Sequence, residues 1–107
     1  MEIDQYSIVL VNLDQAISME IRKTRPCVVI SPVEMNLHLQ TIVVAPMTTK
    51  SRSYPTRVKV RHDKRIGWIV VDQVRTVDRR RIIKRLGKLD QREINKLKDV
   101  IRESYVD

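Results

Sequence analysis

The chain has 107 residues, about the length of one compact domain, and 42% of them are hydrophobic while 32% are charged. This composition can build a core, so it excludes disordered, collagen-like and low-complexity proteins. The 21 Lys and Arg residues outnumber the 13 Asp and Glu residues and give a net charge of +8, which predicts a polyanionic partner. We expect a single domain over residues 1–107.

The first half of the chain predicts three short strands. Ser7–Leu13 is rich in Ile, Val and Leu and is expected to be the first strand, followed by a polar loop over 14–24. The second strand is expected within Arg25–Pro32, which has an apolar centre and a proline near each end, where a strand tolerates a missing N–H. A loop with a helical turn over 33–39 then leads to a third strand over Thr41–Met47.

The second half predicts further strands after a basic loop. The polar segment 48–55 is expected to be a loop, and Thr56–Val60 alternates as a half-exposed strand does. Trp68–Val71 and Ile82–Leu86 are the next predicted strands, with a turn or short helix nucleated by Asp78 between them.

Only the end of the chain has a convincing helical pattern. Asp90 is followed three residues later by Glu93, as in a capping box, and apolar residues then recur at helical spacing, namely Ile94, Leu97, Val100 and Ile101. Several short strands and one amphipathic helix predict an α+β fold. We expect a small, strongly bent antiparallel sheet, or an SH3-like partly open barrel, with a C-terminal α-helix.

The sequence gives no sign of a membrane or secretory protein. Its longest apolar runs have four residues, whereas a membrane-spanning helix needs ~20. The start of the chain is acidic and is not followed by an apolar stretch, and the single cysteine, Cys27, agrees with a reducing compartment. We therefore expect a cytoplasmic protein with no membrane partner.

Several kinds of catalytic site are disfavoured. His38 and His62 lie in separate polar segments, so both are expected to be solvated rather than to form an acid–base pair. Cys27 lies within an apolar strand and is interpreted as a core residue. The only glycines, Gly67 and Gly87, cannot form a glycine-rich phosphate loop, so we expect no nucleotide cofactor.

The carboxylates do not show a recognised metal-binding spacing. Glu20, Asp72 and Asp78 are the candidates, and a metal-dependent nuclease stays open as a minor alternative. Asp78 is interpreted as a structural cap, and the basic run 79–85 as a strand edge protected by charge.

Two basic loops are the most promising functional segments. Residues 20–25 and 48–55 each lie at a strand end and combine Arg and Lys with hydroxyl groups. Tyr54 adds an aromatic ring on which an unpaired base could stack. Together they favour a groove for single-stranded nucleic acid.

Most of the chain resembles MazF/PemK-type toxins, which are sequence-specific endoribonucleases of toxin–antitoxin pairs. The order and spacing of five stretches carry the resemblance: Ile8–Asp14, Glu20–Val29, Val43–Thr49, Tyr54–Thr56 and Asp72–Asp78. The resemblance implies a homodimer that cleaves single-stranded RNA without a metal or other cofactor. It also implies attack by the substrate's 2′-hydroxyl, which leaves a 2′,3′-cyclic phosphate and a 5′-hydroxyl.

The resemblance implies that Arg25 and Thr48 are the catalytic residues. They match the family's arginine before a proline and the threonine that ends the third strand. Because the attacking 2′-hydroxyl is already tethered to the substrate, alignment and stabilisation of charge on the phosphoryl oxygens are the main requirements. The part that Arg25 takes in proton transfer stays open, because a neutral arginine is scarce.

The resemblance also implies a set of RNA-binding residues and a protein partner. The candidates are Glu20, Arg22, Lys23, Thr49, Lys50, Tyr54, Pro55, Asp72 and Gln73. A cognate antitoxin is implied, and an acidic, partly disordered one would suit the +8 charge.

The chain departs from the family pattern at two places, and its composition also fits two other functions. The chain has Tyr6-Ser7 where the family has Gly-Asp, and Ser18-Met19 where it has Gly-Ser in the substrate loop, which we expect to alter sequence preference. A non-catalytic toxin that binds DNA gyrase, as CcdB-type toxins of the same fold do, is one alternative. A basic nucleic-acid-binding module without turnover is the other.

Overall fold

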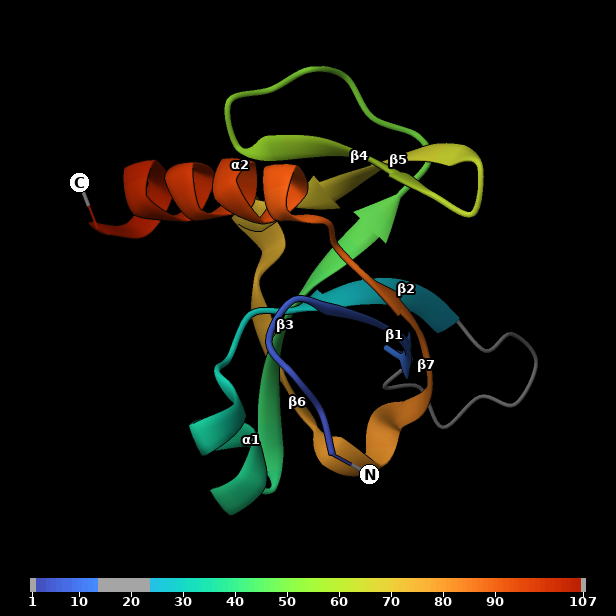
Figure 1. The fold of residues 1–107 in the computed structure, drawn as a ribbon, viewed down its shortest axis with the longest axis vertical. Helices are drawn as coiled ribbons and strands as arrows, with labels where there is room; N and C mark the ends of the chain where they lie inside the picture. The colour runs from blue at the N-terminus through green and yellow to red at the C-terminus, as the bar shows by residue number, and fades with distance from the viewer. Residues whose placement is uncertain (1, 14–23, 107) are drawn as a thin grey trace.

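The computed structural model describes residues 2–13 and 24–106. Within these residues the chain forms a curled antiparallel sheet with a helix packed across one side (Figure 1). The strands are β1 (Ser7–Asn12), β2 (Thr24–Val29), β3 (Thr41–Thr48), β4 (Arg57–His62), β5 (Arg65–Val70), β6 (Arg75–Asp78) and β7 (Ile82–Lys88). The α-helices are α1 (Val33–His38) and α2 (Gln91–Ile101), and shorter helical segments are η1 (Val71–Gln73), η2 (Arg79–Arg81) and η3 (Arg102–Val106).

The sheet curls because β3 changes neighbours along its length. The strand order is β4-β5-β3-β2-β1-β7, and β6 pairs with β3 outside this path. Residues Thr41–Val44 of β3 pair with β6, whereas Met47 and Thr48 pair with β5 on the β4–β5 hairpin. The end of β3 therefore joins the β4–β5 hairpin to the rest of the curled sheet, as Figure 1 shows.

The central strands are buried on both faces, which explains their continuous apolar runs. Successive residues such as Ile8 and Val9, or Val28 and Val29, belong to two different core clusters. One cluster lies under α2 and includes Leu97 and Val100, while the other lies on the opposite face of the sheet. The fold matches the predicted bent antiparallel sheet with a C-terminal helix.

The predicted capping box begins α2. The Glu93 backbone N–H donates to Oδ1 of Asp90 at 2.8 Å, and the Asp90 N–H donates to Oε1 of Glu93 at 3.0 Å. Leu97 and Val100 are buried on the inner face of the helix. The sequence signal for this helix is confirmed.

The structure also differs from the prediction at four elements. Residues 75–78 form the strand β6, which the sequence analysis missed because only Val77 of these four residues is buried. Strand β2 ends at Val29, although the Ile30 N–H still donates to the Val43 carbonyl at 2.8 Å. The segment 33–38 is a short α-helix, and β5 begins at Arg65 instead of Trp68.

Two interpretations of the basic run near residue 80 are confirmed. Asp78 caps η2 by accepting the Arg80 backbone N–H at 2.8 Å. Strand β7 lies at one edge of the sheet and exposes Lys84 and Arg85. No helix among residues 2–13 and 24–106 is long and apolar enough to span a membrane.

Candidate active site

Arg25 and Thr48 lie at the ends of two neighbouring strands. The pairing of strands β2 and β3 ends with Cys27 opposite Pro46, so Arg25 and Thr48 each lie two residues beyond the last pair, at the same end of this antiparallel pair of strands. Thr48 is also the residue at which β3 pairs with β5, opposite Trp68. Both residues that are predicted to be catalytic therefore lie where β3 leaves β2 and the sheet bends.

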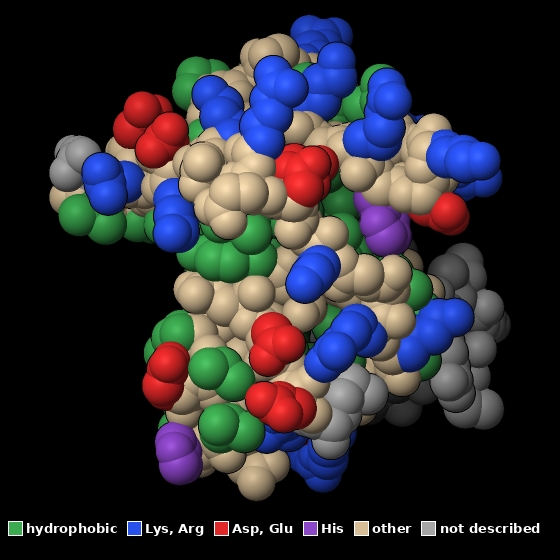
Figure 2. All heavy atoms as spheres, viewed as in Figure 1, with side chains coloured by type: hydrophobic (Ala, Val, Ile, Leu, Met, Phe, Trp, Pro, Cys, Tyr) green, Lys and Arg blue, Asp and Glu red, His purple; other side chains and the backbone are tan. Residues whose placement is uncertain are grey.

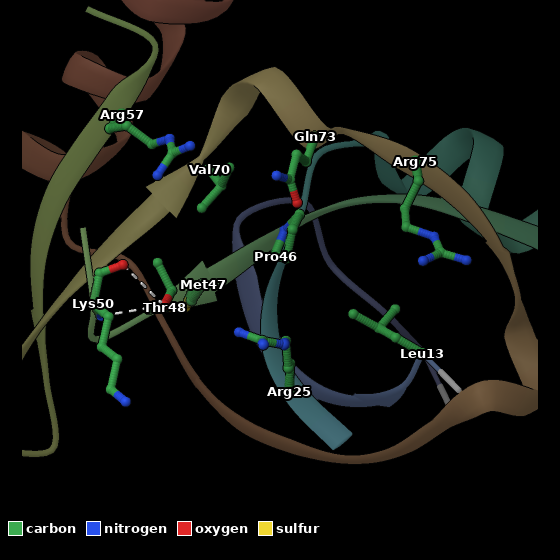
Figure 3. Close-up of a pocket in the computed structure, with 10 residues that line it drawn as sticks. All are labelled: Leu13, Arg25, Pro46, Met47, Thr48, Lys50, Arg57, Val70, Gln73 and Arg75. Carbon is green, nitrogen blue, oxygen red and sulfur yellow. Dashed lines mark hydrogen bonds between the residues drawn. The ribbon is translucent and has the colours of Figure 1, made fainter. Parts of the chain in front are cut away.

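A cleft of about 670 Å³ opens beside this pair, and we call it the Arg25 cleft. Figure 3 shows the side chains around it, with Arg25 pointing from β2 towards Thr48. The lining residues are Leu13, Arg25, Pro46, Met47, Thr48, Lys50, Arg57, Val70, Gln73 and Arg75. Four of these described residues are cationic and none is a carboxylate, so the cleft favours an anionic ligand.

A second cleft, of about 630 Å³, shares part of this lining, and we call it the His62 cleft. Its described lining residues are Thr24, Arg25, Pro26, Met47, Thr48, Thr49, Lys50, His62, Asp63, Arg65, Ile66, Gly67 and Leu86. Arg25, Thr48 and Lys50 line both clefts. A single strand of nucleic acid that occupied both clefts would therefore pass these three residues.

The Thr48 hydroxyl is held by the start of the following loop. Its Oγ1 accepts the Lys50 backbone N–H at 3.1 Å and lies 3.4 Å from the Lys50 carbonyl oxygen, to which it donates weakly (Figure 3). Thr48 is half-buried and Arg25 is exposed. The backbone of Lys50 thus orients the Thr48 hydroxyl. Because the hydrogen bond to the Lys50 carbonyl is long, the hydroxyl can donate instead to an oxygen of a bound ligand.

An ion pair lies at the rim of the Arg25 cleft. Arg57 donates from Nε to Oδ1 of Asp72 at 2.9 Å and from Nη1 to the Ser51 hydroxyl at 2.8 Å. The Thr56 hydroxyl donates to the same Asp72 oxygen at 3.0 Å. The hydrogen bond from Arg57 is the largest of the effects that hold the pKa of Asp72 below its usual value, so the carboxylate stays charged and fixes the guanidinium.

Comparison with known proteins identifies the family. The model of the PemK-like, MazF-like toxins of type II toxin–antitoxin systems matches residues 4–105. This chain belongs to that family of toxins. Comparison with curated proteins found no match.

Solved structures share the fold of this toxin. The Mycobacterium tuberculosis toxin MazF-mt6 is 22% identical with a TM-score of 0.79, over 92% of this chain and 95% of that one. A MazE-MazF crystal structure from Deinococcus radiodurans gives 22% identity and a TM-score of 0.83, over 96% and 95%. An endoribonuclease from mycobacterial species in complex with its cognate antitoxin gives 19% and 0.81, over 95% and 93%.

The structure brings together most of the described residues that the sequence predicted for the toxin's site. Arg25, Thr48, Lys50 and Gln73 line the Arg25 cleft, and Thr49 lines the His62 cleft. Tyr54 and Pro55 line a third hollow next to Arg57, and Asp72 bonds to Arg57. The predicted residues Glu20, Arg22 and Lys23, and the departure Ser18-Met19, lie outside the described residues.

Three cleft residues were missed by the sequence analysis: Arg57, Arg75 and His62. The alternation that predicted strand β4 places Arg57 on the exposed face of that strand, but it does not place Arg57 at the Arg25 cleft. His62 is half-buried in the lining of the His62 cleft, less exposed than His38, and its ring lies beside Gly87, where an added Cβ would lie 3.3 Å from Cε1. Only the fold brings the His62 ring to the cleft.

The remaining titratable candidates do not join the site. His38 is exposed on α1, as predicted. Cys27 is fully buried next to Arg25, and burial raises the pKa of its thiol to about 12, which makes it unreactive. Among the described residues, no three His, Cys, Asp or Glu side chains cluster in a way that could hold a metal ion.

Proposed function

We propose that this toxin is an endoribonuclease that cleaves single-stranded RNA at a short sequence without a metal ion. The observation that carries the proposal is that Arg25 and Thr48 both line two clefts whose described lining is rich in cations. A single strand of RNA lying across both clefts would bring one phosphate to this pair. The family membership supports the same activity.

In the proposed reaction the substrate's 2′-oxygen attacks the adjacent phosphorus and the bond from phosphorus to the 5′-oxygen breaks. The products are a 2′,3′-cyclic phosphate and a 5′-hydroxyl, and one proton moves overall from the 2′-oxygen to the 5′-oxygen. Arg25 and the Thr48 hydroxyl donate hydrogen bonds to the non-bridging oxygens, where negative charge grows. Each such donor contributes roughly 3–4 kcal/mol to the stabilisation of the transition state.

His62 is the proposed group for proton transfer. It lines the same cleft as Arg25 and Thr48, and its ring lies beside Gly87. An imidazole can both accept and donate a proton near neutral pH, whereas a guanidinium stays protonated. We therefore assign proton transfer to His62 and stabilisation of the phosphoryl charge to Arg25.

The proposed RNA-binding residues surround this centre. Thr49, Lys50, Gln73, Tyr54 and Pro55 line the clefts and the adjoining hollow. The family resemblance adds Glu20, Arg22 and Lys23. Asp72 is proposed to act on RNA through Arg57, which it holds in place.

The proposed protein partners are an acidic cognate antitoxin and a second copy of the toxin, and the proposed location is the cytoplasm. The net charge of +8 favours an acidic partner. Two of the similar structures are described as a MazE-MazF structure and as an endoribonuclease with its cognate antitoxin, which supports a partner of this kind.

The test is incubation of the purified toxin with a long single-stranded RNA and with DNA of the same sequence, in excess EDTA. We expect cuts in RNA alone, at one short motif, with 5′-hydroxyl and cyclic phosphate ends. DNA lacks the 2′-hydroxyl and should stay intact. Cleavage that EDTA abolishes, or no cleavage under any condition, would contradict the proposal and favour metal chemistry or gyrase binding.

A further inference from the structure

A third hollow also borders Arg57, and we call it the Trp68 hollow. It has a volume of about 400 Å³ and is lined by Ser53, Tyr54, Pro55, Arg57, Lys59, Trp68 and Lys96. Arg57 lines both this hollow and the Arg25 cleft. The two hollows are therefore neighbours on one surface.

The register of the sheet connects the Trp68 hollow to the candidate active site. Thr48 of β3 pairs with Trp68 of β5, and Trp68 pairs with Lys59 of β4. Directly paired residues of antiparallel strands project from the same face of a sheet, and neighbouring strands lie ~4.8 Å apart. Trp68 is thus one strand away from Thr48, and Lys59 is two strands away, on the same face.

The lining of the Trp68 hollow combines aromatic rings with cations. The Arg57 guanidinium lies 5.3 Å from the centroid of the Tyr54 ring, and the Lys59 ammonium lies 6.0 Å from that of Trp68. Lys96 reaches the hollow from α2, past the edge strand β4. Lys and Arg side chains gather over α2 and the β4–β5 hairpin in Figure 2, and none of the described residues that line the hollow is a carboxylate.

We propose that the Trp68 hollow is a second nucleotide-binding subsite, which binds a base and a phosphate of the single-stranded RNA outside the scissile step. The base stacks on Trp68 or Tyr54, while Lys59 and Lys96 neutralise the neighbouring phosphate. The Lys59 ammonium is at the outer limit of a cation–π contact and can turn to a phosphate. This inference rests on the proposed function, because RNA is the substrate that would extend from the Arg25 cleft.

A nucleotide fits this lining better than an acidic peptide does. Cations alone would suffice to bind carboxylates, whereas a nucleotide uses both the cations and the flat rings. Every base has a face that can stack, so the subsite would add affinity without restricting the sequence.

Trp68 is the only tryptophan in the sequence, so its fluorescence reports directly on this hollow. The experiment titrates the intact toxin with a 2′-O-methyl oligoribonucleotide of mixed sequence, which lacks the attacking hydroxyl and therefore measures binding without cleavage. We expect saturable quenching. Fluorescence anisotropy of a labelled copy of the same oligonucleotide measures the affinity independently.

Two variants and one control locate the binding. Lys96→Ala and Tyr54→Leu should each weaken binding by about 5-fold or more, and Lys96→Ala should reduce the slope of log affinity against log salt by ~0.7. Lys98→Ala is the matched control, because Lys98 is also an exposed lysine of α2 but lies over the Tyr6 ring at 5.9 Å. It should bind as the unmodified toxin does.

Three results would overturn the proposal. The first is that the oligonucleotide binds by anisotropy but does not quench Trp68 fluorescence. The second is that Lys96→Ala and Lys98→Ala lose the same amount of RNA affinity. The third is that oligoglutamate quenches Trp68 fluorescence and the oligonucleotide does not, which would assign the hollow to an acidic protein. The oligonucleotide cannot be cleaved, so this experiment measures binding independently of the reaction. If the oligonucleotide quenches Trp68 fluorescence but the toxin does not cut RNA, the subsite is supported and the proposed reaction is contradicted.

Discussion

Arg57 donates hydrogen bonds to both carboxylate oxygens of Asp72, at 2.9 Å from Nε and 3.4 Å from Nη2. The pair joins the start of β4 to η1 and holds the guanidinium at the boundary between the Arg25 cleft and the Trp68 hollow. Asp72 was predicted to contact RNA. Its hydrogen bonds favour a different role for it, which is to position Arg57.

We expect Asp72→Asn to weaken RNA binding by loosening Arg57. The same change should alter the free energy of unfolding by less than about 1 kcal/mol, because the pair is partly exposed. The measurement is a double-mutant cycle of RNA affinity with Arg57→Ala. If Asp72 acts through Arg57, Asp72→Asn should have little effect in the Arg57→Ala background. Additive effects would instead indicate a direct contact of Asp72 with RNA.

The two histidines provide a matched pair of variants. We expect His62→Gln to lower the single-turnover rate of RNA cleavage by about 10²-fold or more, because it removes the proposed proton-transfer group. His38→Gln should leave the rate unchanged, since His38 is exposed on α1. RNA affinity should be similar in both variants. Equal rates in the two would exclude His62 from the reaction.

The buried thiol predicts slow chemical modification. Because Cys27 is fully buried and its pKa is raised to about 12, the native toxin should not react with a thiol reagent such as Ellman's reagent at pH 8. Modification should appear only as denaturant unfolds the protein. Rapid reaction of the native toxin would show that strand β2 opens next to Arg25.

The cap of η2 predicts a dependence of stability on pH. Hydrogen bonds from the Arg80 side chain, and then from its backbone N–H, lower the pKa of Asp78 from 3.8 to about 2. A carboxylate with a lowered pKa stabilises the fold above pH 3.8, and that stabilisation is lost as the pH falls towards 2. The difference in unfolding free energy between the unmodified toxin and Asp78→Asn should therefore shrink over this range. A difference that is constant between pH 5 and 2 would contradict this role of Asp78.

The parts of the fold that follow from local sequence were predictable. The capping box at Asp90 and the apolar spacing after it define α2, and the apolar runs around Val9 and Val28 define central strands. Strand β6 was missed because Arg75–Asp78 has almost no pattern of its own and becomes a strand only by pairing with β3. Its formation depends on tertiary structure.

Some residues of the candidate site could be predicted from the sequence, and others could not. Arg25 and Thr48 could be proposed from the sequence because they match the resembled family's arginine before a proline and its threonine at the end of the third strand. His62 and Arg57 could not be placed at the clefts, because they lie 37 and 32 residues after Arg25 and reach it only through the β4–β5 hairpin and the bend of β3. Residues that are far apart in the sequence and share no local motif cannot be recognised as neighbours without the structure.

The most direct test of the account compares Arg25→Ala and Thr48→Ala with the unmodified toxin, measuring the single-turnover rate of RNA cleavage and the RNA affinity separately. Loss of one donor to the phosphoryl oxygens should lower the rate by about 10²–10³-fold while affinity changes much less. Arg92→Ala, which removes an exposed arginine of α2, is the control and should cleave normally. Undiminished cleavage by both Arg25→Ala and Thr48→Ala would contradict the account.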